Sequence, residues 1–208
     1  MSKVYIITTA YKADRWIKEC LDSTCRNKEV TVLLGIDGCE ATLERVKEIR
    51  GNYKNLRVFY YPENMGTYKT KNDLISKIPD DGIYITFDSD DKLYVSSVKR
   101  MLNHMPCKSR HGGVHCISKK LYDKLGGYRG WTVHADSDFI RRLEHVSPVK
   151  RLQGLFWRRR HPGQLTKMKH TGLKSALRNK YRKLTNENLK KAKPVIYFKP
   201  EKNVGQEI

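Results

Sequence analysis

The sequence lacks the marks of several protein classes. It has no uninterrupted apolar run of about 18 residues, the length that a membrane-spanning helix requires. The N-terminal segment MSKVYIITTAYKAD has no signal-peptide cleavage pattern. The five cysteines are an odd number with no C-x-x-C pair, which argues against a disulfide framework and against a cysteine zinc site. We therefore expect a soluble, cytoplasmic protein with reduced thiols.

Acidic residues are also scarce. Asp and Glu total 22 against 42 Lys and Arg, which gives a formal net charge of +20. Residues 150–208 hold 17 of the basic residues and three of the acids, a local excess of 14. Such a field attracts polyanions, for example nucleic acid, an anionic lipid surface or a phosphorylated glycan. The alternative is a solvated basic segment that only aids solubility.

What is present is an alternation of strand-like and helix-like segments. Apolar stretches rich in β-branched residues predict strands at residues 3–11, 30–38, 55–64 and 82–91. Segments with helical spacing lie between them, at residues 14–24, 41–51 and 65–79. This order predicts an α/β fold with a mostly parallel sheet flanked by helices.

The second half of the chain is less regular. We predict a strand followed by a helix in residues 114–128, a helix in residues 136–146 with Asp136 as its N-cap, and a last strand in residues 151–160.

The C-terminal part is expected to be separate. A basic helix with one apolar side is predicted at residues 173–193. We therefore divide the chain into a main domain, residues 1–168, and a basic C-terminal helical extension, residues 169–208.

Polar side chains gather where the predicted strands end. In a mostly parallel sheet these ends meet at one edge, and ligands bind there. Neither G-x-G-x-x-G nor G-x-x-x-x-G-K-[ST] follows a strand, so a dinucleotide loop and a P-loop are not supported. The groups expected to face one crevice are residues 8–11, Asp37 with Gly38, residues 64–66 and residues 88–91.

The stretch ITFDSDDKL places three carboxylates directly after an apolar run. Burial of these charges without a partner would be costly. Asp88 and Asp90 alternate along an extended chain, so both point to the same side and can together bind Mn²⁺ or Mg²⁺ with the oxygens of a diphosphate. The alternative is an Asx-rich turn that caps the next helix.

Six motifs occur in order within residues 3–166: ITTAYK, GIDG, ENMGTYKTKND, FDSDD, LGGYRGWTVHADSDFIRRL and RRRHPGQLT. Together they resemble the family-2 glycosyltransferases, inverting enzymes of the GT-A fold that use nucleotide-diphosphate sugars. Two positions differ from the family's pattern. The usual Glu-Asp pair is Ala135-Asp136, which affects acceptor positioning, and the usual Ser after the histidine is Gln164.

The resemblance implies roles for individual residues. Asp136 would be the catalytic base, with Asp138 as a second candidate. Asp90 and His161 would bind the Mn²⁺ or Mg²⁺ that neutralises the leaving diphosphate. Asn72 and Thr166 match further motif positions. Donor binding is expected at Thr9, Ala10, Tyr11, Asp37, Asn64, Gly66, Lys69, Asp88, Ser89 and Arg159.

Several of these residues also have a simpler interpretation. His161 lies in a basic stretch where it could simply face solvent. Asp37 could have no function beyond forming an Asp-Gly turn, and Lys69 could be an exposed charge on a helix. Trp131 suits either stacking on a sugar or base, or burial in the core. The residues alone leave these alternatives open.

The acceptor is inferred from charge. Basic residues interleaved with Trp157, Tyr181, Tyr197 and Phe198 suit a phosphate backbone and a stacked base. The first hypothesis is therefore transfer to hydroxymethylated or glycosylated DNA bases, as by a phage enzyme in the host cytoplasm. The second is a bacterial transferase that builds lipopolysaccharide or another anionic surface glycan, with the basic helix on the membrane surface. The third is a metal-dependent nucleic-acid enzyme or a nucleic-acid binder.

Overall fold

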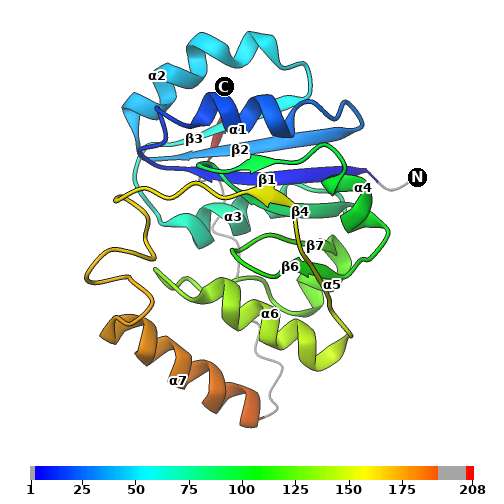
Figure 1. The fold of residues 1–208 in the computed structure, drawn as a ribbon, viewed down its shortest axis with the longest axis vertical. Helices are drawn as coiled ribbons and strands as arrows, with labels where there is room; N and C mark the ends of the chain where they lie inside the picture. The colour runs from blue at the N-terminus through cyan, green and yellow to red at the C-terminus, as the bar shows by residue number, and fades with distance from the viewer. Residues whose placement is uncertain (1–2, 192–204) are drawn as a thin grey trace.

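The computed structural model describes residues 3–191 and 205–208 (Figure 1). Its main strands are β1 (Val4–Ala10), β2 (Val30–Asp37), β3 (Leu56–Tyr61), β4 (Ile83–Asp88), β6 (Cys107–Ser109), β7 (His115–Ser118), β8 (Lys150–Leu152) and β10 (Gln206–Glu207). Within the described residues they form an eight-stranded sheet with the order β10-β3-β2-β1-β4-β7-β6-β8. A separate two-stranded sheet pairs β5 (Lys92–Leu93) with β9 (Phe156–Trp157).

Helices cover both faces of the main sheet, and each face has its own cluster of buried side chains. One cluster includes side chains of α1 (Ile17–Thr24), α2 (Glu40–Ile49) and α4 (Ser97–Leu102). The other includes side chains of α3 (Thr67–Ser76), α5 (Lys119–Lys124) and α6 (Ala135–Val146). A 3₁₀ turn, η1 (Arg50–Asn52), follows α2. No helix within the described ranges combines the length and the apolar character needed to cross a membrane.

The central strand β1 explains the apolar sequence pattern. Its neighbours Ile6 and Ile7 point to opposite faces of the sheet, and both are fully buried. A strand covered by helices on both faces is apolar at successive positions rather than at alternate ones. The parallel pairing of β1 with β2 and with β4 confirms the mostly parallel α/β sheet predicted from the sequence.

The strand order also positions the crevice. In the sheet β1 lies between β2 and β4, so the chain runs from β1 to a strand on one side, and β4 lies on the other side. In open α/β sheets the ligand crevice lies at such a change of direction, beyond the carboxyl ends of the strands. The register aligns Thr9 of β1 with Asp88 of β4. The predicted strand-end groups of β1 and β4 are therefore neighbours.

Two local predictions were wrong. The N-cap of α6 is His134, and Asp136 lies in the first turn, where a carboxylate also interacts favourably with the helix dipole. Residues 151–160 do not form one strand, because the chain turns at Gly154, which has φ +62°. β8 before the turn pairs with β6, and β9 after it pairs with β5.

The predicted basic helix is present as α7 (Ala176–Lys190), with the Ser175 side chain as its N-cap. It packs on α6, where Thr185 Oγ1 donates to Asp138 Oδ1 at 3.1 Å. The rings of Trp131 and Tyr181 stack 4.5 Å apart, so within this structure the partner of Trp131 is a protein side chain. Tyr197 and Phe198 lie outside the described residues, and the division of the chain at residue 168 stays a prediction.

Candidate active site

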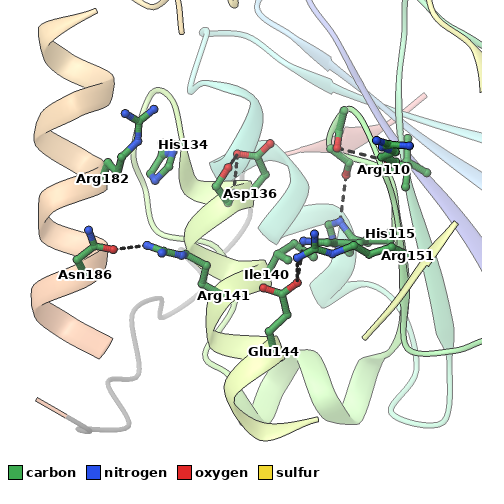
Figure 2. Close-up of a pocket in the computed structure, with 16 residues that line it drawn as sticks. Arg110, His115, His134, Asp136, Ile140, Arg141, Glu144, Arg151, Arg182 and Asn186 are labelled. Atoms are coloured by element: carbon green, nitrogen blue, oxygen red, sulfur yellow. Dashed lines mark hydrogen bonds and ion pairs between the residues drawn. The ribbon is translucent and has the colours of Figure 1, made fainter. Parts of the chain in front are cut away.

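A cleft of about 470 Å³ opens between α6, α7 and the part of the sheet formed by β7, β6 and the edge strand β8 (Figure 2). Asp136 and Arg141 line it from α6, and Arg182 lines it from α7. Lys108 and Arg110 line it from β6 and the loop that follows. The cleft therefore adjoins the acid that the sequence assigns as the catalytic base.

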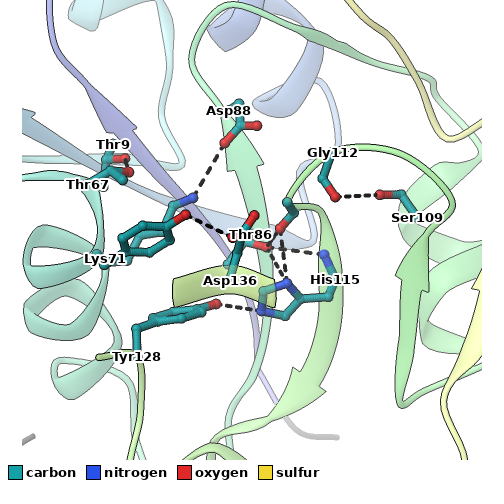
Figure 3. Close-up of polar contacts among 12 residues, drawn as sticks. Thr9, Thr67, Lys71, Thr86, Asp88, Ser109, Gly112, His115, Tyr128 and Asp136 are labelled. Carbon is teal, nitrogen blue, oxygen red and sulfur yellow. Dashed lines mark hydrogen bonds and ion pairs between the residues drawn. The ribbon is translucent and has the colours of Figure 1, made fainter. Parts of the chain in front are cut away.

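Helix α3 connects this acid to the strand ends (Figure 3). The Tyr68 hydroxyl donates to Asp136 Oδ1 at 3.0 Å, and one turn later Lys71 Nζ lies 3.4 Å from Asp88 Oδ1. Residues three apart on a helix lie on the same face, so both contacts are made by one side of α3. Asp88 and Asp136, 48 positions apart in the sequence, are therefore both linked to the same side of α3.

The two candidate bases have different environments. Asp136 is half-buried, and its Oδ1 also accepts the Ser137 amide at 2.7 Å. Its Oδ2 lies on the side of Gly113: a Cβ added to Gly113 would be 3.4 Å from this oxygen. Asp138 is only 1% exposed, and Arg129 and Arg142 each donate to its Oδ2 at 2.9 Å. Asp138 is thus a structural ion-pair partner, and the geometry favours Asp136 as the base.

Lys71 is a residue that the sequence analysis missed. Its side chain is 6% exposed, against 42% for that of Asp88, so its charge is buried beside the carboxylate. Lys69, the predicted phosphate contact, is exposed, and its stem passes close to Gly130. The helical spacing of Lys71 from the buried Tyr68 and Ile75 is the signal that distinguishes the two lysines.

Asp37, the predicted base reader, is 2% exposed at the end of β2. Its Oδ1 accepts the Met65 amide at 2.8 Å and its Oδ2 accepts the Gly66 amide at 3.0 Å. Burial raises the pKa of Asp37, while these hydrogen bonds act in the opposite direction. Gly66 has φ +86°, which glycine adopts readily, and Asn64 Oδ1 accepts the same Gly66 amide at 3.1 Å. Asp37 therefore fixes the loop before α3, and base recognition by it stays a prediction.

The two predicted metal ligands are adjacent. Asp90 Oδ2 lies 3.0 Å from His161 Nε2, and their side chains are 22% and 23% exposed. A carboxylate oxygen and an imidazole nitrogen are ligand types that suit Mn²⁺, so this pair fits a divalent cation. Gln164 Nε2 donates to the same oxygen at 3.3 Å. Among residues 3–191 and 205–208 no three His, Cys, Asp or Glu side chains form a metal site, so further ligands would come from the donor diphosphate and water.

Arg159 anchors the segment that carries His161. Its guanidinium lies between the rings of Trp16 and Trp157, 4.2 and 4.8 Å from their centroids. Its Nε donates to the Asp90 carbonyl at 3.1 Å, and its amide donates to Asp91 Oδ1 at 2.8 Å. Arg159 thus holds the predicted metal ligands together, and a contact between its side chain and the donor stays a prediction.

Other predicted donor residues lie around the same strand ends. Thr9 Oγ1 is 2.7 Å from Thr67 Oγ1 at the start of α3. Ala10 is buried, so only its backbone can contact a ligand, whereas Tyr11 is 47% exposed. Ser89 is half-buried in the turn between Asp88 and Asp90. The motif residue Thr166 is half-buried in the segment after His161.

Asn72 has a structural function. It is 1% exposed, and its amide group donates to the Tyr128 carbonyl and accepts the Tyr128 amide, both at 2.9 Å. Tyr122 also donates its hydroxyl to Asn72. The side chain thus fastens α3 to the loop containing Gly126 and Gly127, which leads toward α6.

Strand β7 contributes a buried histidine, His115, to the lining of the cleft (Figure 3). His115 is 1% exposed; its Nδ1 lies 3.0 Å from the Gly113 carbonyl oxygen, and its Nε2 lies 2.5 Å from the Tyr128 hydroxyl. Burial, and secondly the charge of Lys71, lower the pKa of His115 to about 3 from 6.5. Between these two values the unfolded chain binds more protons than the folded protein, so stability decreases as the pH falls from about 6.5 toward 3.

We expect His115→Gln to reduce this dependence. In the wild type this group contributes a loss of up to about 1.4 kcal/mol of unfolding free energy for each pH unit below 6.5. Urea unfolding between pH 7.5 and pH 4.5 should therefore give a shallower decrease for the variant than for the wild type. His104→Gln, at an exposed position, is the control that should follow the wild type. Parallel profiles for His115→Gln and the wild type would contradict the assignment.

The solved structures of TarS from S. aureus have a similar fold. TarS 1–349 in complex with UDP-GlcNAc matches with a TM-score of 0.66 at 17% identity, over 78% of this chain and 60% of TarS 1–349. Its complex with UDP gives 0.64 at 17% identity, over 77% and 61%. A longer TarS structure gives 0.62 at 17% identity, over 77% and 37%. This chain thus spans about 60% of the length of TarS 1–349, and the similarity establishes a common fold.

These observations define the chain as a protein of the GT-A fold. No curated protein sequence matches it. The model of glycosyl transferase family 2 matches residues 5–145, well over half of the chain. The chain therefore belongs to glycosyl transferase family 2, which confirms the resemblance seen in its motifs.

Proposed function

We propose that this protein transfers a sugar from a nucleotide-diphosphate donor to an acceptor hydroxyl, with inversion at the anomeric carbon and Asp136 as the general base. The observation that carries the proposal is the arrangement of α3, which joins Asp136 through Tyr68 and Asp88 through Lys71. A proton acceptor and the donor-side acid Asp88 are thus linked to one face of the same helix. Family membership supports the same chemistry.

In this reaction the acceptor oxygen forms a bond to the anomeric carbon while the bond from that carbon to the diphosphate breaks. The acceptor proton passes to Asp136, and the nucleoside diphosphate leaves with the bonding electron pair. Tyr68 and Ser137 both donate to Oδ1 of Asp136, which fixes the carboxylate and leaves Oδ2 as the proton acceptor. Lys71 beside Asp88 supplies fixed positive charge on the donor side.

Asp90 and His161 would hold Mn²⁺ or Mg²⁺, and such a cation, when bound, stabilises the negative charge that develops on the leaving diphosphate. The protein's own contribution is the geometry of these ligands. Gln164 and Arg159 both bond to Asp90, which keeps it next to His161 before any donor binds. Asp88 and Ser89 are predicted from the sequence to bind the donor, and we assign them to its ribose side.

For the acceptor we propose a polyanion. The net charge of +20 and the basic residues around the cleft support this class. Modified DNA bases and an anionic surface glycan are the two candidates predicted from the sequence. The third hypothesis, a nuclease, nucleotidyltransferase or nucleic-acid binder, has no support from the family to which the chain belongs.

A donor assay tests the proposal. The protein should release nucleoside diphosphate slowly from at least one of UDP-GlcNAc, UDP-glucose and GDP-mannose in the presence of Mn²⁺ and without an acceptor, because water can replace the acceptor hydroxyl. EDTA should abolish this release. The absence of both binding and release across a wider panel of sugar nucleotides would overturn the proposed function.

A further inference from the structure

The cleft beside Asp136 is strongly basic, and none of the predicted donor-binding residues lines it. Five of the side chains that line it are cationic and two are carboxylates, Asp136 and Glu144. Glu144 forms ion pairs with Lys108 at 2.8 Å and with Arg151 at 3.3 Å, so this one carboxylate already pairs with two of the cations. The remaining cations are Arg110 in the loop after β6, Arg141 in α6 and Arg182 in α7.

These three arginines are exposed and are not neutralised by acids. Arg141 donates to Asn186, and Arg182 donates to Asn179 at 3.2 Å, so both partners are uncharged amides. In the part of the chain that the structure describes, no carboxylate lies within ion-pair distance of any of the three. Figure 2 shows Arg141 extending from α6 toward Asn186 of α7, and Arg182 on α7 beside His134. Arginine in such an arrangement binds phosphate oxygens in a bidentate manner.

His134 provides a second observation that points to a ligand. Its side chain lines the cleft and the residue is 7% exposed, yet within the described residues its Nε2 is buried with no hydrogen-bond partner. Its backbone has φ +72°, a left-handed conformation that is unfavourable for a residue with a side chain. Strain and an unsatisfied nitrogen together, two positions before Asp136, are typical of a functional site.

The chemistry of the lining distinguishes between the two polyanions. An extruded base is held mainly by stacking on aromatic rings. No Phe, Tyr or Trp occurs among the described residues that line the cleft, and the nearby rings of Trp131 and Tyr181 already stack on each other. A hydroxylated chain with phosphate groups needs hydrogen bonds and positive charge, which the cleft supplies.

We infer that this cleft binds a phosphate-bearing glycan as the acceptor. Arg141 and Arg182 contact its phosphates, and His134 Nε2 hydrogen-bonds to it and orients a hydroxyl toward Asp136. This inference rests on the proposed function and deepens it. It favours the second of the two acceptors over modified DNA, and it gives α7 the function of one wall of the acceptor site.

The test compares two charge-matched double variants. Arg141→Gln with Arg182→Gln removes two charges from the cleft, whereas Lys180→Gln with Lys183→Gln removes two exposed charges of α7 that do not line it. Fluorescein-labelled phosphomannan, a mannan with phosphodiester groups, is the probe, and fluorescence anisotropy gives its affinity. We expect the cleft variant to bind it about tenfold or more weakly than the wild type, and the control variant to stay within about twofold.

Further measurements separate the outcomes. His134→Asn, which tolerates the left-handed backbone, should also bind phosphomannan more weakly while unfolding near the wild-type temperature. Equal affinities for the two double variants would overturn the inference. So would a cleft variant that loses single-stranded DNA binding but keeps phosphomannan binding, because this would identify a nucleic-acid site. Donor hydrolysis by the wild type tests the proposed function separately, so the two failures are distinguishable.

Discussion

Asp136→Asn should lower the rate of sugar transfer by about 100- to 10,000-fold, the usual contribution of a general base. The side chain keeps its size, and Oδ1 of the amide can still accept the hydroxyl of Tyr68 and the amide of Ser137. What is lost is the proton acceptor at the second oxygen, on the side of Gly113. Binding of the donor, measured by titration with UDP-GlcNAc or whichever sugar nucleotide proves active, should change by less than about threefold because the donor-side residues are untouched.

Two further variants make this prediction specific. Tyr68→Phe removes only the hydrogen bond that orients Asp136, so we expect a smaller decrease in kcat with little change in stability. Asp138→Asn removes the negative charge of a buried carboxylate that bonds to Arg129 and Arg142, and it should mainly lower stability, on the order of 3 kcal/mol. Two results together would identify Asp138 as the base instead. Sugar transfer would have to survive in Asp136→Asn, and Asp138→Asn would have to lose more activity than its loss of stability explains.

The fold could be predicted from the sequence because its signals are local. Buried strands such as β1 are runs of apolar and β-branched residues, and the helices between them show one apolar face. Once the sheet is known to be mostly parallel, its strand ends must share an edge, which brings Thr9 and Asp88 together. The division of residues 151–160 into β8 and β9 was missed because it depends on one glycine and on strands far away in the sequence.

The environment of individual acids could not be predicted in the same way. Asp136 and Asp138 lie two positions apart on α6 and look equivalent in the sequence. Their difference arises from residues of other segments: Arg129 and Thr185 surround Asp138, and Tyr68 contacts Asp136. Helical spacing places Lys71, unlike Lys69, on the buried side of α3, but its partner Asp88 comes from another segment, so the ion pair itself could not be predicted.

Asp90→Asn should abolish the effect of manganese on the reaction. The substitution replaces the carboxylate, the anionic ligand type of the pair formed with His161, by an uncharged amide. We expect donor hydrolysis and sugar transfer to fall by at least about 100-fold at a fixed Mn²⁺ concentration. His161→Asn, which replaces a neutral ligand by another neutral group, should have a smaller effect. Electron paramagnetic resonance of free Mn²⁺ in the presence of UDP measures the loss of metal binding directly.

The apo protein provides the necessary control. Asp90 also accepts a hydrogen bond from Gln164, so its substitution could act only by loosening the segment that Arg159 anchors. In that case the unfolding temperature measured without metal would decrease enough to explain the loss of activity, and excess Mn²⁺ would not restore turnover. If Asp90 is a ligand, unfolding without metal changes little, while the stabilisation that Mn²⁺ with UDP gives the wild type is lost. Asp80→Asn changes an exposed acid in the turn before β4, at the opposite end of that strand from Asp90. It should retain the stabilisation, because a general decrease in negative charge does not remove a coordinating oxygen.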